Sequence, residues 1–168
     1  AVRGACRMHD LGKGSTPADV LPRHIGHEGR SVKLAAQIAQ RLRVPSDCKE
    51  LAEVVAREHG NIHRSETFQA DALLRLLTRC DAIRQPARFA QVLLACECDA
   101  RGRLGFEERD YPQARRLARA LQAALRVPTA ELAAQAAREG LQGPQIGARI
   151  DAARAAAVAK RLQTEAPA

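Results

Sequence analysis

Aromatic residues are nearly missing from this sequence. They make up 2% of the 168 residues, with three phenylalanines, one tyrosine and no tryptophan, whereas alanine, leucine and arginine dominate. Strands are enriched in aromatic and β-branched side chains, while alanine and leucine favour helices. The composition therefore argues against a β-sheet and predicts an all-α protein built as a helical bundle.

Long apolar runs and disulfide patterns are also lacking. No stretch approaches the roughly 20 apolar residues that a membrane-spanning helix needs, and the chain opens with no signal peptide. The five cysteines are odd in number and form no CxxC pair, which favours a reducing, cytoplasmic setting. Cys96 and Cys98 would suit a metal, but their apolar helical setting favours buried thiols.

Positive charge is abundant. The 27 lysines and arginines outnumber the 19 aspartates and glutamates and give a net charge of +8. An excess of this size favours a polyanionic partner such as nucleic acid. It also occurs in arginine-rich proteins that have no such partner, so charge alone leaves both interpretations open.

Glycine and proline divide the sequence into segments with helical periodicity. Gly12 and Gly14 predict that a first helix ends at Leu11 through a left-handed stop. Further helices are expected over residues 30–43, from 70 or 71 to about 80, from 86 onward, and over 112–126, 129–139 and 144–162. The proline-containing stretch at 127–129 predicts a main domain over 1–127 and a smaller C-terminal helical segment over 128–168, with a loose tail from Thr164.

One further helix carries two histidines at a spacing typical of zinc sites. Asp47 with Glu50 predicts its capped start, and Gly60 with the following asparagine predicts its end. His59 and His63 have the i, i+4 spacing of a two-histidine site. Because we expect the helix to break between them, this pair is not favoured as a zinc motif.

Candidate metal ligands occur at four successive expected helix ends. His9 and Asp10 end the first helix, His27 precedes the second, His59 ends the next, and Asp81 follows the one after it. A bundle whose helix ends converge would place these imidazoles and carboxylates around one cation, and such mixed ligation suits borderline or hard divalent metals. His27 also lies at a helix start, where free N–H groups favour phosphate. Taken alone, the adjacent pair His9-Asp10 is better explained as a polar helix end.

The order of these residues resembles the HD phosphohydrolase superfamily, in which histidines, a His-Asp pair and a final aspartate lie on separate helices. Three longer stretches are similar to the HD domain of the bacterial multifunctional CCA proteins. They run from His9 to Glu28, from Arg41 to Cys48 and from Cys96 to Glu107. The resemblance covers about residues 3–125, and the later residues match more loosely.

The resemblance implies a metal-dependent phosphohydrolase that acts as 2′,3′-cyclic phosphodiesterase, 2′-nucleotidase and phosphatase, linked to CCA addition at tRNA 3′ ends. It implies catalytic roles for His9, Asp10 and His59, and metal binding by His9, Asp10, His27 and Asp81. The implied substrates are tRNA or nucleotide 2′-phosphates and 2′,3′-cyclic phosphates. The implied metals are nickel or another transition metal for hydrolysis and magnesium in the intact enzyme.

Nucleotide addition itself is not expected from this chain. It lacks a glycine-serine pair followed by spaced aspartates on strands, which two-metal nucleotide addition requires. An N-terminal nucleotidyltransferase domain is therefore expected to lie outside the chain.

Two features depart from the family's pattern. The superfamily's first histidine belongs on a helix before residue 1, so we expect the domain over 1–127 to be N-terminally incomplete. Gly60 stands where close relatives carry an aspartate after the histidine that matches His59. Both departures favour an alternative function, a catalytically degenerate scaffold that binds tRNA.

Four basic residues are candidates for phosphate or RNA contacts. Lys13 and Arg23 lie near the candidate ligands, and Arg101 and Arg103 lie in a glycine-containing loop. Three of them have a simpler interpretation: Lys13 favours a helix C-terminus, and Arg101 and Arg103 tie the loop to the bundle by ion pairs. Residues 128–168 are a candidate tRNA-contacting tail.

Overall fold

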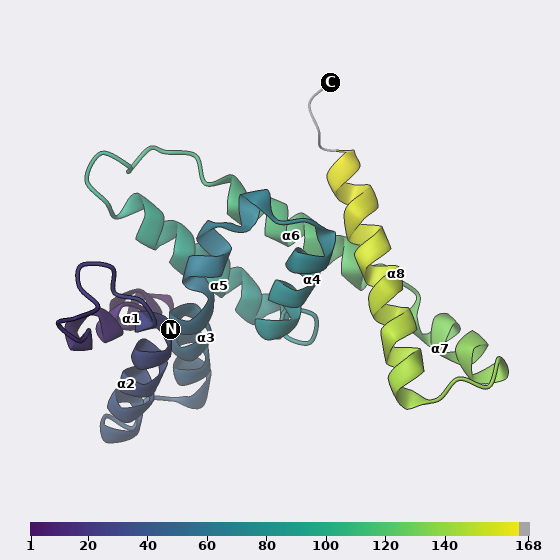
Figure 1. Ribbon diagram of the computed structural model, residues 1–168, viewed down its shortest axis with the longest axis horizontal. Helices are drawn as coiled ribbons and strands as arrows, with labels where there is room; N and C mark the ends of the chain where they lie inside the picture. Colours follow the sequence, from purple (N-terminus) through teal and green to yellow (C-terminus); the bar gives the residue numbers. More distant parts are fainter. Residues whose placement is uncertain (165–168) are drawn as a thin grey trace.

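The computed structural model describes residues 1–164, which form eight α-helices, two short 3₁₀ turns and no strand. Their bounds are α1 Val2–Met8, η1 Leu11–Ser15, α2 His27–Arg41, α3 Ser46–His63, η2 Ser65–Thr67, α4 Ala70–Arg79, α5 Pro86–Arg101, α6 Pro112–Leu125, α7 Thr129–Arg138 and α8 Gly143–Gln163 (Figure 1). The all-α prediction is confirmed. The tail expected to be loose falls, apart from Thr164, outside the described residues.

Helix α3 is the centre of the bundle. It packs against α1, α2 and α5, and its buried face includes Leu51, Val55 and Ile62. Phe89 of α5, 1% exposed, lies in the same core. Side chains of this kind dominate the stability of a small bundle because each removes a large apolar area from water. None of the described helices is long and apolar enough to cross a membrane.

Helices α7 and α8 project from one side of the bundle (Figure 1). Helix α8 packs on α4 and α6 and contributes the fully buried Val158 to the main core. Helix α7 packs against α8. The predicted domain boundary at residues 127 and 128 falls between α6 and α7 and stays a prediction.

Gly12 does not stop a helix, which corrects the first expectation. Helix α1 ends at Met8, and Gly12 is not among the glycines with positive φ. It is needed for close packing instead: a Cβ atom here would lie 2.2 Å from the His27 carbonyl oxygen and 2.6 Å from the Ser31 nitrogen. Only glycine lets η1 lie this near the start of α2.

Two expectations about α3 are also wrong. The helix begins at Ser46 with no side-chain cap, so Asp47 and Glu50 form no capping box. It continues through Gly60 to His63. Glycine inside a helix costs only about 1 kcal/mol, and the burial of this face, including Ile62 beyond the glycine, offsets that cost.

Candidate metal centre

The candidate centre lies where the ends of α1, α2 and α3 meet around the carboxylate of Asp10. His9 Nε2 lies 3.3 Å from Asp10 Oδ2, and His27 Nε2 lies 3.2 Å from Oδ1. His59 Nε2 is 3.5 Å from Oδ1 and 3.3 Å from His27 Nε2. The structure thus brings together His9, Asp10, His27 and His59, in agreement with the sequence-based expectation.

Each residue is positioned by the end of a helix or by a buried helix face. His9 caps the C-terminus of α1, and Asp10 follows it in the turn before η1. His27 is the first residue of α2. His59 lies on the buried face of α3, where its exposed fraction is 5%. Because α3 packs against both α1 and α2, the His59 imidazole lies close to His9, Asp10 and His27.

Hydrogen bonds to the backbone fix the orientation of all three imidazoles. His9 Nδ1 lies 2.8 Å from the Cys6 carbonyl oxygen, and His27 Nδ1 lies 3.1 Å from that of His24. His59 Nδ1 lies 3.1 Å from the carbonyl oxygen of Val55. A carbonyl oxygen can only accept, so each Nδ1 donates, and each neutral ring presents the lone pair of Nε2 to the centre. This arrangement is typical of histidines that bind metals.

The ligand atoms of His9, Asp10 and His59 all lie within 4.8 Å of one another, a spacing that fits a divalent cation, whereas His27 falls outside this set. Ligand atoms about 2.1 Å from a metal lie about 3.0 Å apart at right angles and about 3.4 Å apart at tetrahedral angles. The separations from the Asp10 oxygens to the histidine nitrogens are 3.2–3.5 Å. His9 Nε2 and Asp10 Oδ1 are both buried, and neither atom has a hydrogen-bond partner among residues 1–164. Such atoms are rare in proteins unless another group bonds them.

The charges at the centre favour a cation. Burial lowers the pKa of His59, and repulsion from His9 lowers it further. Burial opposes protonation of His9 as well, but the nearby carboxylates of Asp99 and Asp10 outweigh it and raise its pKa. Burial would raise the pKa of Asp10, yet Lys13 and His9 hold it below its usual value. Asp10 therefore stays anionic, beside a His59 ring whose lowered pKa favours its neutral form.

Asp99 is the residue that sequence reasoning missed. It lies on α5, and its Oδ1 is 3.3 Å from His9 Nε2. Its Oδ2 is 2.8 Å from His63 Nε2, and His63 Nδ1 is 2.8 Å from the hydroxyl of Tyr111. Burial would raise the pKa of Asp99, but its interactions with His63 and His9 hold it well below the ordinary range. In the sequence, the only indication of a role for Asp99 was its place in the stretch from Cys96 to Glu107, which is similar to the HD domain of the CCA proteins.

Asp81 does not join the centre, which corrects the expectation that it is a ligand. It has a φ of 54° in the turn after α4. Its Oδ1 is 2.8 Å from Arg84 Nε, and its Oδ2 is 3.0 Å from an Arg88 nitrogen. The hydrogen bond from Arg84, together with the charges of both arginines, lowers its pKa. The Asp81 carboxylate is therefore paired with the guanidinium groups of Arg84 and Arg88 instead of taking part in the centre.

The histidine pair of α3 shares one helix after all, but the two rings have different partners. His59 faces Asp10, whereas His63 bonds Asp99 and Tyr111. The reason for not favouring the pair was wrong, because the helix does not break. The pair nevertheless makes no two-histidine site, because His63 Nε2 is bonded to the Asp99 carboxylate rather than facing Asp10.

The predicted phosphate-binding residues fall in two places. Lys13 Nζ is 2.6 Å from Asp10 Oδ2, which puts its charge at the edge of the centre. Arg23 is exposed in the loop before α2. Arg101 is the last residue of α5, and Arg103 lies in the α5–α6 loop, on the side of the centre where Asp99 contacts His9.

The two loop arginines make ion pairs with α5. An Arg101 nitrogen is 3.1 Å from Glu97 Oε1, and an Arg103 nitrogen is 3.9 Å from Asp99 Oδ2. The Arg101 pair lies within α5 and ties no loop to the bundle, so only the Arg103 contact agrees with the ion-pair interpretation; both side chains remain largely exposed. Nearby, Cys96 is buried, as expected, whereas Cys98 is exposed, so the expectation of two buried thiols is wrong for Cys98.

Comparison with known proteins gives consistent matches. The chain is 64% identical over 168 residues to the multifunctional CCA protein of Paracidovorax citrulli (strain AAC00-1), a match that covers 100% of the chain and 40% of that protein. It is 63% identical over 165 residues to the multifunctional CCA protein of Verminephrobacter eiseniae (strain EF01-2), covering 98% and 40%. It is 64% identical over 157 residues to that of Polaromonas naphthalenivorans (strain CJ2), covering 94% and 37%.

The chain spans about 40% of the length of the first relatives that it matches. No protein-family model matches it, and no solved structure does. The chain is thus closely similar, along nearly its whole length, to one part of the multifunctional CCA proteins, and the family resemblance predicted from its motifs is confirmed.

Proposed function

We propose that this chain is a metal-dependent phosphohydrolase domain that acts on 2′-phosphates and 2′,3′-cyclic phosphates at nucleotide or RNA ends. In this proposal it forms part of a CCA-adding tRNA nucleotidyltransferase and works on tRNA in the cytoplasm. Nucleotide addition, with its magnesium, belongs to the part of the protein that lies outside this chain. The names and lengths of the relatives support the link to CCA proteins.

One observation carries the proposal of hydrolysis. Three imidazole Nε2 atoms, each oriented by a backbone carbonyl, converge on one carboxylate with ligand-like spacing. Three imidazoles gathered around one partly buried carboxylate are the kind of donor set that a divalent cation takes. A bound divalent cation would polarise a phosphoryl oxygen and lower the pKa of a water molecule at the site.

The chain's own residues then have separate tasks. His9, His27 and His59 would hold the cation through Nε2, together with Asp10. Asp10 Oδ1 carries no hydrogen bond from the described residues, so it is available as a ligand or to accept a proton from attacking water. Lys13, 41% exposed, supplies positive charge beside the carboxylate and can bind a phosphate oxygen.

Hydrolysis of 2′,3′-cyclic AMP tests the proposal. We expect turnover by the chain with added nickel or another transition metal, loss of turnover with a chelator, and loss in His9→Ala and His59→Ala. His24→Ala is the matched control, because the His24 ring bonds Thr16 outside the centre. No turnover under any divalent metal, or equal turnover in His9→Ala and His24→Ala, would contradict the proposal.

The second candidate is a catalytically degenerate scaffold that binds tRNA. The net charge of +8 and the glycine at position 60 favour it. In that case salt-dependent tRNA binding would persist in His9→Ala while no metal-dependent hydrolysis occurs in the unaltered chain. Indifference to tRNA at low salt would exclude this alternative.

A further inference from the structure

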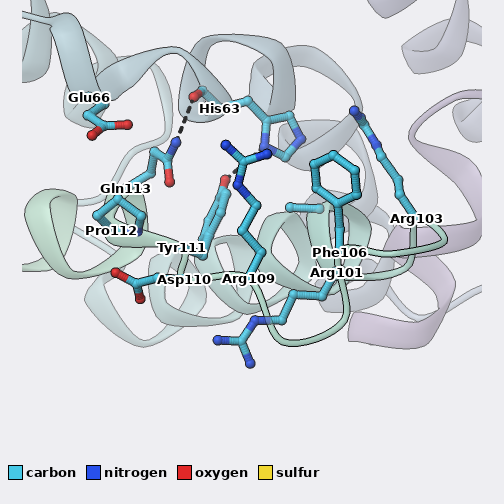
Figure 2. A pocket seen from close by; sticks show the side chains of 11 residues that line it. His63, Glu66, Arg101, Arg103, Phe106, Arg109, Asp110, Tyr111, Pro112 and Gln113 are labelled. Carbon is cyan, nitrogen blue, oxygen red and sulfur yellow. Dashed lines mark hydrogen bonds between the residues drawn. The ribbon is translucent and has the colours of Figure 1, made fainter.

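A cavity adjoins the metal centre on the far side of His63. It has a volume of about 410 Å³ and is lined mainly by the α5–α6 loop, with the end of α3 and the start of α6 (Figure 2). His63 lies on its wall, and the Asp99 carboxylate that binds His63 also lies 3.3 Å from His9 Nε2. A volume of this size is typical of sites for small ligands.

One part of the cavity is basic. Arg101, Arg103 and Arg109 line it, and within the described residues no carboxylate lies within ion-pair distance of Arg109. The two acidic residues that line the cavity, Asp110 and Glu66, reduce its positive charge only a little. The Asp110 carboxylate forms an ion pair with Arg115, at 2.8 and 2.7 Å, and Figure 2 shows Glu66 at the opposite end of the cavity from Arg103 and Phe106.

The same part of the cavity contains an exposed aromatic ring. Phe106 is 38% exposed, whereas Phe89 is 1% exposed and Tyr111 is 6% exposed. The Arg109 guanidinium carbon lies 5.0 Å from the centre of the Phe106 ring, and Figure 2 shows this side chain between Tyr111 and Phe106. In a sequence with 2% aromatic residues, a partly exposed phenylalanine with one arginine over its ring and two more lining the same cavity has the composition of a nucleobase-stacking site.

We propose that this cavity binds a nucleotide of a single-stranded nucleic acid, with its base stacked on Phe106 and its phosphate held by Arg109 and Arg103. The inference extends the proposed function, because the cavity and the metal centre lie on either side of His63 and Asp99. A strand whose terminal phosphate lies at Asp10 would have its neighbouring nucleotide within reach of the cavity. The cavity therefore selects a strand with a base, while the centre acts on its phosphate.

Binding of a fluorescein-labelled hexa-adenylate RNA, measured by anisotropy in the presence of chelator, tests this inference. The comparison strand has the same length and charge but lacks the bases. We expect Phe106→Ala to weaken binding of hexa-adenylate about 5- to 150-fold and to leave binding of the abasic strand unchanged. Leu104→Ala is the matched control, since Leu104 is in the same loop, is 95% exposed and does not line the cavity.

Arg109→Ala tests the phosphate contact. It should weaken binding of both strands and reduce the slope of log affinity against log salt by about 0.7, the loss of one phosphate contact. Arg41→Ala removes an exposed arginine at the end of α2 and should leave the slope unchanged. The inference would be overturned if Arg109→Ala and Arg41→Ala changed the salt slope equally, or if Phe106→Ala bound hexa-adenylate as tightly as the original chain. So would the absence of hexa-adenylate binding by the unaltered chain at low salt.

Hydrolysis of bis(4-nitrophenyl) phosphate with nickel separates this inference from the proposed function. This small diester needs the metal centre but no adenine site. Base-dependent binding without hydrolysis would support the cavity and contradict the phosphohydrolase. Hydrolysis without base-dependent binding would support the centre and overturn the cavity.

Discussion

Replacing Gly12 by alanine should damage both stability and metal binding. The added Cβ would lie 2.2 Å from the His27 carbonyl oxygen, 2.6 Å from the Ser31 nitrogen and 2.8 Å from the Arg30 Cβ, so η1 must move away from α2. That movement stretches the bond from the Gly12 nitrogen to Ser31 Oγ, at 2.9 Å, and the bond from Arg30 Nε to the Gly12 carbonyl, at 3.0 Å. Overpacking together with two weakened hydrogen bonds gives a loss of about 3–5 kcal/mol in the free energy of unfolding.

Urea denaturation followed by circular dichroism measures this loss. Gly14→Ala is the matched control, because Gly14 lies in the same 3₁₀ turn and a Cβ there meets nothing within 4 Å. We expect the control to stay within about 1 kcal/mol of the original chain. Nickel binding by calorimetry should weaken in Gly12→Ala, because the shift separates Asp10 from His27. An unchanged urea midpoint in Gly12→Ala would refute the packing argument.

Three further predictions follow from the same structure. Nickel at one hundred times its dissociation constant should stabilise the chain by about 2.7 kcal/mol in thermal denaturation and should not stabilise His59→Ala; equal stabilisation would place the cation elsewhere. Phe89→Ala should lower the free energy of unfolding by about 3–5 kcal/mol in urea, whereas Leu104→Ala should change it by less than about 0.5 kcal/mol. Arg79→Met should cost about 1–3 kcal/mol in the same assay, because it removes a partner from the Glu58 carboxylate, which is 2% exposed; a stabilising effect would contradict this.

The sequence predicted the helices and the convergence of His9, Asp10, His27 and His59. Helical periodicity and proline positions locate most elements, and potential ligands at successive helix ends indicate one centre. The detailed roles of the glycines were not predictable in the same way. Gly12 serves a contact with α2, and Gly60 is tolerated inside α3 by burial that only the packed structure provides.

The choice between two carboxylates likewise depends on packing. Asp81 and Asp99 are both aspartates at or near a helix end, and both are followed by arginines a few residues later, so the local sequence alone does not show which one faces the centre. Arg84 lies three residues after Asp81 and Arg88 seven residues after it, so Asp81 finds its counterions nearby. Asp99 finds His9 and His63 from two other helices, and such long-range partners leave no local pattern to read.

Asp99 also connects the candidate metal centre with the neighbouring cavity. One of its oxygens faces His9, and the other binds His63, which Tyr111 holds from the cavity side. A ligand that shifts Tyr111 or His63 would therefore act on His9 through two short contacts, without touching the centre. The bundle packs these residues from α1, α3, α5 and the start of α6 against one another, so movement in the cavity must be accommodated at the centre as well.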